Sequence, residues 1–178
     1  MKRLSVLLAA AALALVPTAS QAELAQGAAA PNFAARGALG GKVFAFNLRD
    51  ALRRGPVVLY FYPKAFTSGC TAEAHAFAEA SADFAAAGAT VIGMSNDDIG
   101  TLRKFSTEAC RDKFAVASAS PAVIRAYGVN LVRDGEDTGL ASRTSYVIGR
   151  DGRVAMVHSD MDWRDHVRLT LEAVRGMR

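Results

Sequence analysis

One cysteine in this sequence stands where a nucleophile would be favoured. Cys70 follows an apolar run, residues 56–62, and opens an alanine-rich segment, residues 71–87, whose spacing of aromatic residues predicts a helix. The backbone N–H groups of a helix's first turn are unpaired and the helix dipole is positive there, so a sulfur at this place is favoured as a thiolate. The thiolate is the nucleophilic form of cysteine. Cys70 is therefore a candidate nucleophile, and the alternative is a small buried hydrophobic residue.

Two residues that precede Cys70 could shape its surroundings. Thr67 lies three positions earlier and can bring a hydroxyl, both donor and acceptor, to the same turn. Pro63 ends the apolar run and has no backbone N–H, so it can help to keep water out. The pattern thus favours a shielded sulfur with a polar group beside it.

The elements that must position these residues follow from hydrophobic periodicity and turn signals. We expect strands at residues 43–48, 56–62, 90–94, 114–117, 145–148 and 154–157, and helices at residues 71–87, 99–110, 121–127 and 163–174. The run 56–62 is typical of a buried central strand, and Asp151-Gly152 predicts a hairpin. Strands that alternate with helices indicate one three-layer α/β domain.

The first residues are typical of a secretory signal peptide. Lys2 and Arg3 precede an apolar run, residues 6–16, and small residues follow it. This run is shorter than the roughly 20 residues that span a bilayer, although an uncleaved anchor is an alternative. We expect residues 1–22 to be removed and residues 23–178 to form the mature domain, which would be periplasmic or secreted.

After cleavage we expect no membrane partner, and the remaining charge argues against a nucleic-acid partner. Removing Lys2 and Arg3 lowers the net charge from +4 to +2, and the other basic residues are interspersed with acids. The chain has 178 residues, of which 51% are hydrophobic and 21% charged, which excludes a disordered class. We expect residues 23–30 to be a flexible lead-in.

No metal or cofactor site is expected. Two cysteines exclude a four-cysteine zinc or iron–sulfur centre. His158 and His166 are eight residues apart, and the tight ligand spacing of a metal motif is missing. The glycine pairs predict turns and do not match a phosphate-binding loop.

Residues 60–73 carry a family resemblance. They read Tyr-Phe-Tyr-Pro-Lys-Ala-Phe-Thr-Ser-Gly-Cys-Thr-Ala-Glu, in which proline, threonine and cysteine have the spacing Pro-x-x-x-Thr-x-x-Cys. This segment resembles the peroxiredoxin active-site motif and is most similar to the branch called peroxiredoxin Q or bacterioferritin-comigratory protein. The resemblance extends to residues 30–33, 41–42 and 143–148.

The resemblance implies a thioredoxin-like fold and the reduction of hydroperoxides. Cys70 matches the peroxidatic cysteine, which becomes a sulfenic acid. Thr67 matches the threonine that orients the peroxide, and Pro63 matches the proline that shields the pocket. Arg143 matches the arginine that stabilises the thiolate and the polarised peroxide. Glu73 matches an acid that can orient this arginine, and the alternative is a solvated carboxylate in the first helical turn.

The sequence departs from this branch at the second cysteine. Many members carry a resolving cysteine five residues after the first, where this chain has His75. Cys110 is the only other thiol, and it could be a resolving cysteine, a partner in a static disulfide, or a buried residue without a redox role. We favour the resolving role, which would require the first turn around Cys70 to unwind because a disulfide needs Cα atoms within about 7 Å.

Two other functions compete with a thiol peroxidase. A thiol–disulfide oxidoreductase or electron carrier normally needs Cys-x-x-Cys, and here Thr67 and Glu73 occupy the two possible positions of a second sulfur. A non-catalytic thioredoxin-fold binding module would not need the motif residues. We therefore expect a hydroperoxide substrate, a thiol reductant (thioredoxin-like, glutaredoxin-like or a small thiol) and a monomer.

Overall fold

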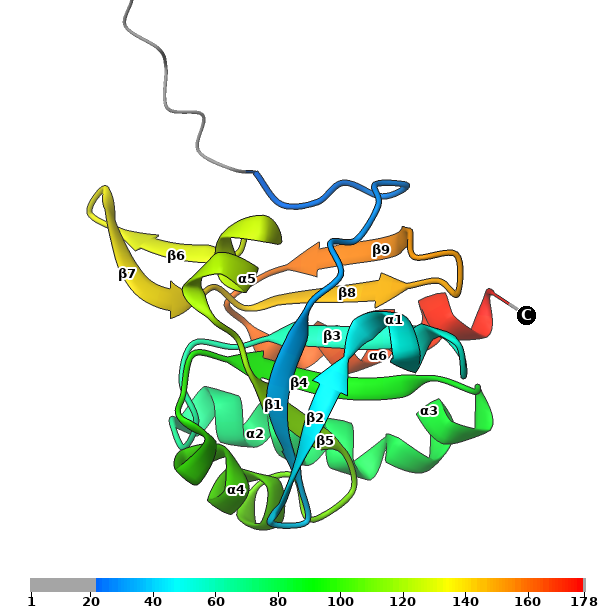
Figure 1. Ribbon diagram of the computed structural model, residues 1–178, viewed down its shortest axis with the longest axis horizontal. Coiled ribbons are helices and arrows are strands. Elements are labelled where there is room, and N and C mark those ends of the chain that lie inside the picture. The colour runs from blue at the N-terminus through cyan, green and yellow to red at the C-terminus, as the bar shows by residue number, and fades with distance from the viewer. Residues whose placement is uncertain (1–21, 178) are drawn as a thin grey trace, which may run out of the picture.

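The computed structural model describes residues 22–177, which form a mixed β-sheet covered by helices on both faces (Figure 1). Except for its last position, the predicted signal peptide, residues 1–22, lies outside the described residues. The described helices include none with both the length and the apolar character needed to cross a membrane.

The main sheet of the described chain has seven strands in the order β2-β1-β5-β4-β3-β8-β9. These strands are β1 (Ala34–Leu39), β2 (Lys42–Asn47), β3 (Val57–Phe61), β4 (Thr90–Ser95), β5 (Ala115–Ser118), β8 (Thr144–Ile148) and β9 (Val154–Ser159). Strands β3, β4 and β5 are parallel, and the other neighbours in the sheet are antiparallel. A separate hairpin of β6 (Asn130–Arg133) and β7 (Glu136–Ala141) projects from the body of the domain (Figure 1).

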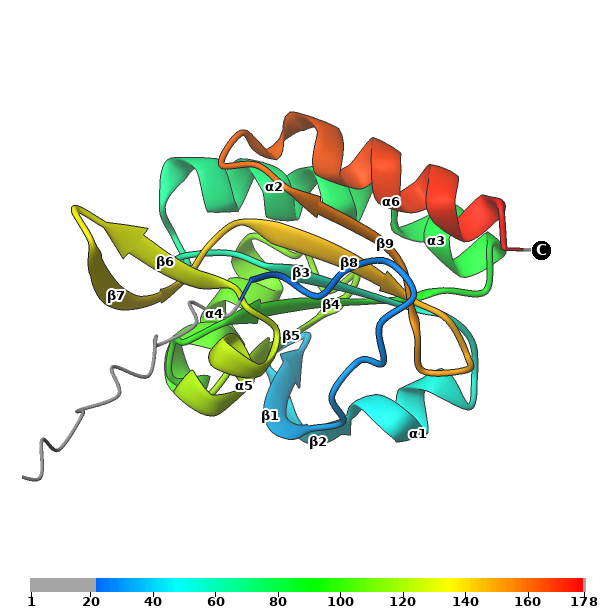
Figure 2. The same ribbon diagram turned by 90° about the horizontal axis from the view of Figure 1, so that it is seen from above.

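The helices make the two outer layers, as the α/β expectation requires (Figure 2). On one face lie α2 (Ser68–Glu79), α3 (Ser81–Ala86), α4 (Ile99–Glu108) and α6 (His166–Arg175). On the other face lie α1 (Leu48–Leu52) and α5 (Pro121–Ala126). Each face buries its own apolar cluster against the sheet, which gives a three-layer domain.

Strand β3 is fully buried, as its β-branched and aromatic residues predict. Its side chains alternate between the faces: Leu59 and Phe61 join the cluster under α1 and α5, whereas Tyr60 joins the cluster under α2. The ring of Tyr60 stacks on Phe77 of α2 at 4.3 Å between centroids. This contact places α2 directly over the carboxyl end of β3.

Several predicted boundaries are wrong. The expected strand 43–48 ends at Asn47, because the Asn47 side chain accepts a hydrogen bond from Asp50 N and begins α1 at Leu48. The expected helix 71–87 starts earlier, at Ser68, and divides at Ala80 into α2 and α3. The expected helix 163–174 begins as a 3₁₀ turn, Trp163–Asp165, before α6.

Strand β1 and the β6–β7 hairpin were not predicted, because their residues are small or exposed and lack a clear hydrophobic alternation. The expected lead-in, residues 23–30, is held by main-chain bonds. Gly27 N donates to Val154 O at 2.7 Å, and Ala30 N donates to Gly152 O at 2.8 Å. The hairpin predicted at Asp151-Gly152 is confirmed by the pairing of β8 with β9.

Candidate active site

The turn between β3 and α2 places Cys70 in the first turn of a helix. Ala65 N donates to Asp97 Oδ2 at 2.8 Å, which ties the turn to the end of β4. Phe66 has a φ of 64°, a left-handed conformation that bulky residues rarely adopt. Thr67 is the extended N-cap residue, so α2 begins at Ser68 and encloses Cys70, which is 2% exposed. The sulfur thus lies where helical N–H groups and the dipole favour an anion.

Arg143 reaches this sulfur from the amino end of β8, the strand that lies beside β3 in the sheet. It immediately precedes β8, whose antiparallel register with β3 pairs Thr144 with Phe61. The carboxyl end of β3 and the amino end of β8 therefore meet where α2 begins. Arg143 Nη2 donates to Cys70 Sγ at 3.5 Å, although the two residues are 73 positions apart in the sequence.

The guanidinium of Arg143 is held by three partners and is 4% exposed. Besides the sulfur, Nε donates to Met161 O at 3.0 Å and Nη1 donates to Glu73 Oε2. Burial lowers the pKa of Arg143, but the negative charges of Glu73 and Cys70 outweigh it and raise the pKa above its ordinary value. The site therefore holds a permanent cation beside the sulfur, which stabilises a thiolate.

Glu73 is not the solvated carboxylate that was the alternative, because its side chain is fully buried one helical turn after Cys70. Burial raises the pKa of Glu73 to about 8, although the nearby Arg143 opposes this increase. Glu73 Oε1 lies 3.8 Å from Nδ1 of His166, which is also fully buried. Burial lowers the pKa of His166 to about 4, so this ring is neutral at neutral pH.

His166 joins the site to the end of the chain. Its Nδ1 lies 2.8 Å from Ser145 Oγ, and its Nε2 lies 3.0 Å from the carbonyl oxygen of Asp160. The sequence pattern considers His166 only together with His158 as a metal ligand, and it does not predict the contact of His166 with Glu73. The signal that could have found it is a histidine at the start of a terminal helix, but nothing in the sequence shows that this helix packs against α2.

The other motif residues lie in the same turn as Cys70. Thr67 is exposed, and its hydroxyl donates to the Lys64 carbonyl at 3.0 Å, which leaves its lone pairs free to accept. Pro63 is half-buried directly after Tyr62, whose N–H donates to Met94 O. The structure thus gathers Cys70, Arg143 and Glu73 in direct contact, with Pro63 and Thr67 on the loop that leads to them.

Cys110 lies apart from this group. In the described chain both cysteines are free thiols, so no static disulfide joins them. Cys110 is fully buried just after α4, and burial together with the nearby Asp112 charge raises the pKa of its thiol well above the ordinary range. Cys110, Cys70, Tyr60 and Tyr62 belong to the same buried cluster on one face of the sheet.

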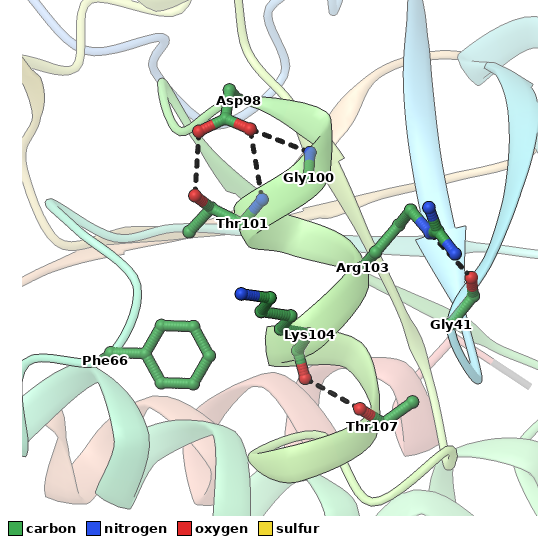
Figure 3. Close-up of a pocket in the computed structure, with 8 residues that line it drawn as sticks. All are labelled: Gly41, Phe66, Asp98, Gly100, Thr101, Arg103, Lys104 and Thr107. Atoms are coloured by element: carbon green, nitrogen blue, oxygen red, sulfur yellow. Dashed lines mark hydrogen bonds between the residues drawn. The ribbon is translucent and has the colours of Figure 1, made fainter.

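A cavity of about 770 Å³ borders the active-site loop without containing the sulfur (Figure 3). Its lining comes from the loop, from α4 and from the β1–β2 turn: Gly41, Phe66, Asp98, Gly100, Thr101, Arg103, Lys104 and Thr107. The Asp98 carboxylate caps α4 and accepts from Gly100 N, Thr101 N and Thr101 Oγ1. Its oxygens are therefore already hydrogen-bonded to the first turn of the helix. The cavity therefore offers space next to Phe66, and Cys70 is not among the residues that line it.

This arrangement can reduce a bond between two oxygens. A thiolate at a helix N-terminus supplies the electron pair, and the Arg143 guanidinium offers fixed N–H donors toward charge that develops beside the sulfur. The described residues contain no group of three or more His, Cys, Asp or Glu side chains placed to hold a metal ion.

Comparisons with known proteins agree with this chemistry. The model of the AhpC/TSA family matches residues 26–157. The chain is 30% identical over 156 residues to the chloroplastic peroxiredoxin Q of Oryza sativa subsp. japonica, covering 87% of this chain and 69% of that protein.

Solved structures show the same fold. Peroxidoxin BcpB from Mycobacterium tuberculosis superposes with a TM-score of 0.77 at 30% identity, covering 88% of this chain and 99% of that one. A bacterioferritin comigratory protein from Xanthomonas campestris gives a TM-score of 0.70 at 26% identity, covering 80% and 90%. The fold is thus thioredoxin-like, as the motif implied. From the family match, these relatives and the buried cysteine–arginine pair, it follows that this chain belongs to the AhpC/TSA family, in the peroxiredoxin Q and bacterioferritin-comigratory branch, and is a thiol peroxidase.

Proposed function

We propose that this enzyme reduces hydrogen peroxide or small organic hydroperoxides through a sulfenic acid on Cys70. The observation that carries the proposal is the 3.5 Å contact between Arg143 Nη2 and Cys70 Sγ in a buried helix N-terminus. The thiolate attacks one peroxide oxygen, the S–O bond forms, the O–O bond breaks, and the leaving oxygen takes a proton to become water or an alcohol. The structure of the Xanthomonas relative was described in connection with alkyl peroxide reduction, which supports this substrate class.

Thr67 and Pro63 complete the site in this proposal. The Thr67 hydroxyl has free lone pairs at the mouth of α2 and accepts a hydrogen bond from the peroxide. Pro63 offers no N–H to water where the chain leaves β3 and so shields the pocket. Arg143 stabilises both the thiolate and the negative charge that develops on the leaving oxygen.

Cys110 is the resolving cysteine in this proposal. Its thiol condenses with the Cys70 sulfenic acid, which forms a disulfide and releases water. Because Cys110 is fully buried and its thiol is hard to ionise, attack requires a local opening of the folded enzyme. Arg111 and Asp112, which follow it, have φ values of 50° and 58°, so the segment beside Cys110 is strained and can supply part of this opening.

We also propose that the enzyme acts as an exported monomer. Residues 1–22 would be the signal peptide and residues 23–178 the mature periplasmic or secreted protein. A thioredoxin-like, glutaredoxin-like or small thiol would then reduce the Cys70–Cys110 disulfide and complete the cycle.

The test compares peroxide consumption, with dithiothreitol as reductant, by the wild type, Cys70→Ser and Cys110→Ser. We expect Cys70→Ser to lose turnover, because serine is not ionised at neutral pH and cannot accept the oxygen. Mass mapping after one equivalent of peroxide should show a Cys70–Cys110 disulfide in the wild type and a sulfenic acid at Cys70 in Cys110→Ser. Equal turnover in the wild type and Cys70→Ser would exclude the peroxidase mechanism. A persistent sulfenic acid in the wild type, with Cys110 still free, would exclude only the resolving role.

A further inference from the structure

The Glu73 carboxyl group has one oxygen without a hydrogen-bond partner in the described part of the chain. Oε2 accepts from Arg143 Nη1, but Oε1 accepts from no group, although the side chain is fully buried. A buried carboxylate oxygen without a donor is costly, because it has lost its water and gained nothing in exchange. A proton on Oε1 removes this cost.

The group that faces Oε1 is an acceptor. A carbonyl oxygen can only accept, so His166 Nε2 carries the ring hydrogen and donates it to Asp160 O at 3.0 Å. In the neutral ring Nδ1 then has a lone pair, which accepts from Ser145 Oγ at 2.8 Å and lies 3.8 Å from Glu73 Oε1. Two acceptors that face each other repel unless a hydrogen lies between them. Ser145 already donates to this lone pair, so His166 offers no N–H to Glu73 Oε1, and the hydrogen that removes the repulsion has to be carried by Glu73 itself.

The balance of buried charge points the same way. When Cys70 is a thiolate, the sulfur and an ionised Glu73 would be two buried anions beside one cation, Arg143. One cation cannot compensate two anions that have left water. The other titratable groups that act on Glu73, Arg143 or His166 are Tyr60 of β3, His158 of β9, and the exposed Asp160 and Asp162 of the loop after β9. Both aspartates are exposed and Asp162 pairs with Arg164, so neither of them supplies a cation that would compensate the second buried anion.

The titration behaviour of the pair agrees with this geometry. Burial raises the pKa of Glu73 to about 8 and lowers the pKa of His166 to about 4. Of the two side chains, the carboxyl group therefore carries a proton at neutral pH, and the imidazole is neutral.

We propose that Glu73 holds a proton on Oε1, the oxygen that faces His166 Nδ1, while Cys70 is a thiolate, and releases it when the sulfur is oxidised. The thiolate donates an electron pair to the hydroperoxide, the S–O bond forms, and the O–O bond breaks to leave an alkoxide or hydroxide. The sulfenic acid is neutral, so Arg143 now needs an anionic partner and Glu73 ionises. The released proton balances the alkoxide or hydroxide, which becomes the alcohol or water. This proposal rests on the proposed attack by Cys70.

The test counts the protons that the enzyme takes from solvent during one oxidation. Reduced protein carrying Cys110→Ser is mixed with one equivalent of peroxide in weak buffer with a pH indicator, below about pH 8, where Glu73 is protonated. Thiolate absorbance in the ultraviolet confirms for each variant that Cys70 is ionised before mixing. We expect the Cys110→Ser protein with Glu73 intact, called the wild-type site, to take up close to zero protons per peroxide. Glu73 supplies the proton that the alkoxide or hydroxide needs. Glu73→Gln has no proton to release and should take up about one.

His166→Asn and His158→Asn form a matched pair of variants. The asparagine amide at position 166 can present an N–H to Glu73 Oε1 where His166 has a lone pair, which keeps Glu73 ionised and should raise the uptake toward one proton. His158 touches the His166 ring, at 4.6 Å between centroids, but not Glu73, so His158→Asn should behave like the wild type. If Glu73→Gln does not fold, as judged by circular dichroism, the comparison of these two variants carries the test.

Uptake of about one proton by the wild type, equal to that of Glu73→Gln, would overturn the proposal. Equal uptake by His166→Asn and His158→Asn would remove His166 from it. Either result leaves peroxide consumption intact, whereas failure of the proposed peroxidase would appear as no oxidation of Cys70 at all.

Discussion

At the scale of single residues, Arg143 is the buried cation of the candidate active site. Its guanidinium donates to Cys70 Sγ, Glu73 Oε2 and Met161 O at the same time. A planar group with N–H donors on three nitrogens can satisfy three acceptors in fixed directions, whereas the lysine ammonium is a compact charge on a flexible stem. The geometry of these donors therefore contributes beyond the positive charge itself.

Arg143→Lys is expected to slow the reaction of Cys70 with hydroperoxide by about 10²- to 10³-fold, because one or more preorganised donors to the developing charge are lost. The measurement is the second-order rate constant of sulfur oxidation, followed by the fluorescence of Trp163, the only tryptophan, which lies near Gly69. Arg168→Lys is the matched control, since Arg168 is exposed and pairs with Asp165 and Glu172 on the surface. A rate for Arg143→Lys within twofold of the wild type would show that positive charge alone is sufficient.

At the scale of elements, the site depends on how closely β3, β4 and α2 pack. Tyr60 of β3 lies over Gly93 of β4, and its ring stacks on Phe77 of α2. A Cβ atom at position 93 would come within 2.7 Å of the Tyr60 ring, which is closer than atoms can approach. The absence of a side chain at Gly93 thus allows the aromatic layer that supports α2 and Cys70.

Gly93→Ala should lower the free energy of unfolding by about 1–3 kcal/mol, because the tyrosine ring must leave its position in a close-packed core. Urea unfolding of the reduced protein measures this loss. Gly176→Ala is the control, since a Cβ there would meet only ordinary contacts of 3.5 Å or more at the end of α6. Equal stability of Gly93→Ala and the control would show that Tyr60 can move without cost.

At the scale of the whole molecule, Glu73 and His166 give the fold opposing dependences on pH. The folded-state pKa of Glu73 is raised from 4.5 to about 8. Its contribution to the free energy of unfolding is therefore fully present below pH 4.5 and is lost as the pH rises toward 8. The folded-state pKa of His166 is lowered from 6.5 to about 4. Its contribution to the free energy of unfolding is therefore fully present above pH 6.5 and is lost as the pH falls toward 4. The two effects oppose each other between 4.5 and 6.5, and Glu73 acts alone between 6.5 and 8.

The unfolding free energy of the reduced protein should therefore contain a decrease of about 2 kcal/mol between pH 6.5 and 8 that comes from Glu73, at about 1.4 kcal/mol per pH unit. Urea unfolding at these two pH values should show the decrease in the wild type and its loss in Glu73→Gln. Glu172→Gln is the control, because Glu172 is exposed and pairs with Arg168 on the surface of α6. The same decrease in wild type and Glu73→Gln would contradict the assignment to Glu73.

The sequence predicted the central elements better than the peripheral ones. Strand β3 and the hairpin at Asp151-Gly152 were predicted because an apolar run and turn residues are local signals. Strand β1 escaped prediction, since its alanines and glycine pair with β2 and β5 without a hydrophobic pattern of their own. The division of the alanine-rich helix at Ala80 also has no local signal, because alanine favours a continuous helix.

By itself, the sequence predicted a candidate nucleophile and the turn that carries it. The spacing of Pro63, Thr67 and Cys70 after a buried strand indicated a thiol at a helix N-terminus, since each of these signals is local. Only the tertiary structure decided what surrounds that thiol. Arg143 meets Cys70 across 73 positions because β8 pairs with β3 in one register, and His166 faces Glu73 because α6 packs beside α2. Such contacts depend on how distant strands and helices pack, and burial then sets the charge of Glu73, which no pattern along the chain reveals.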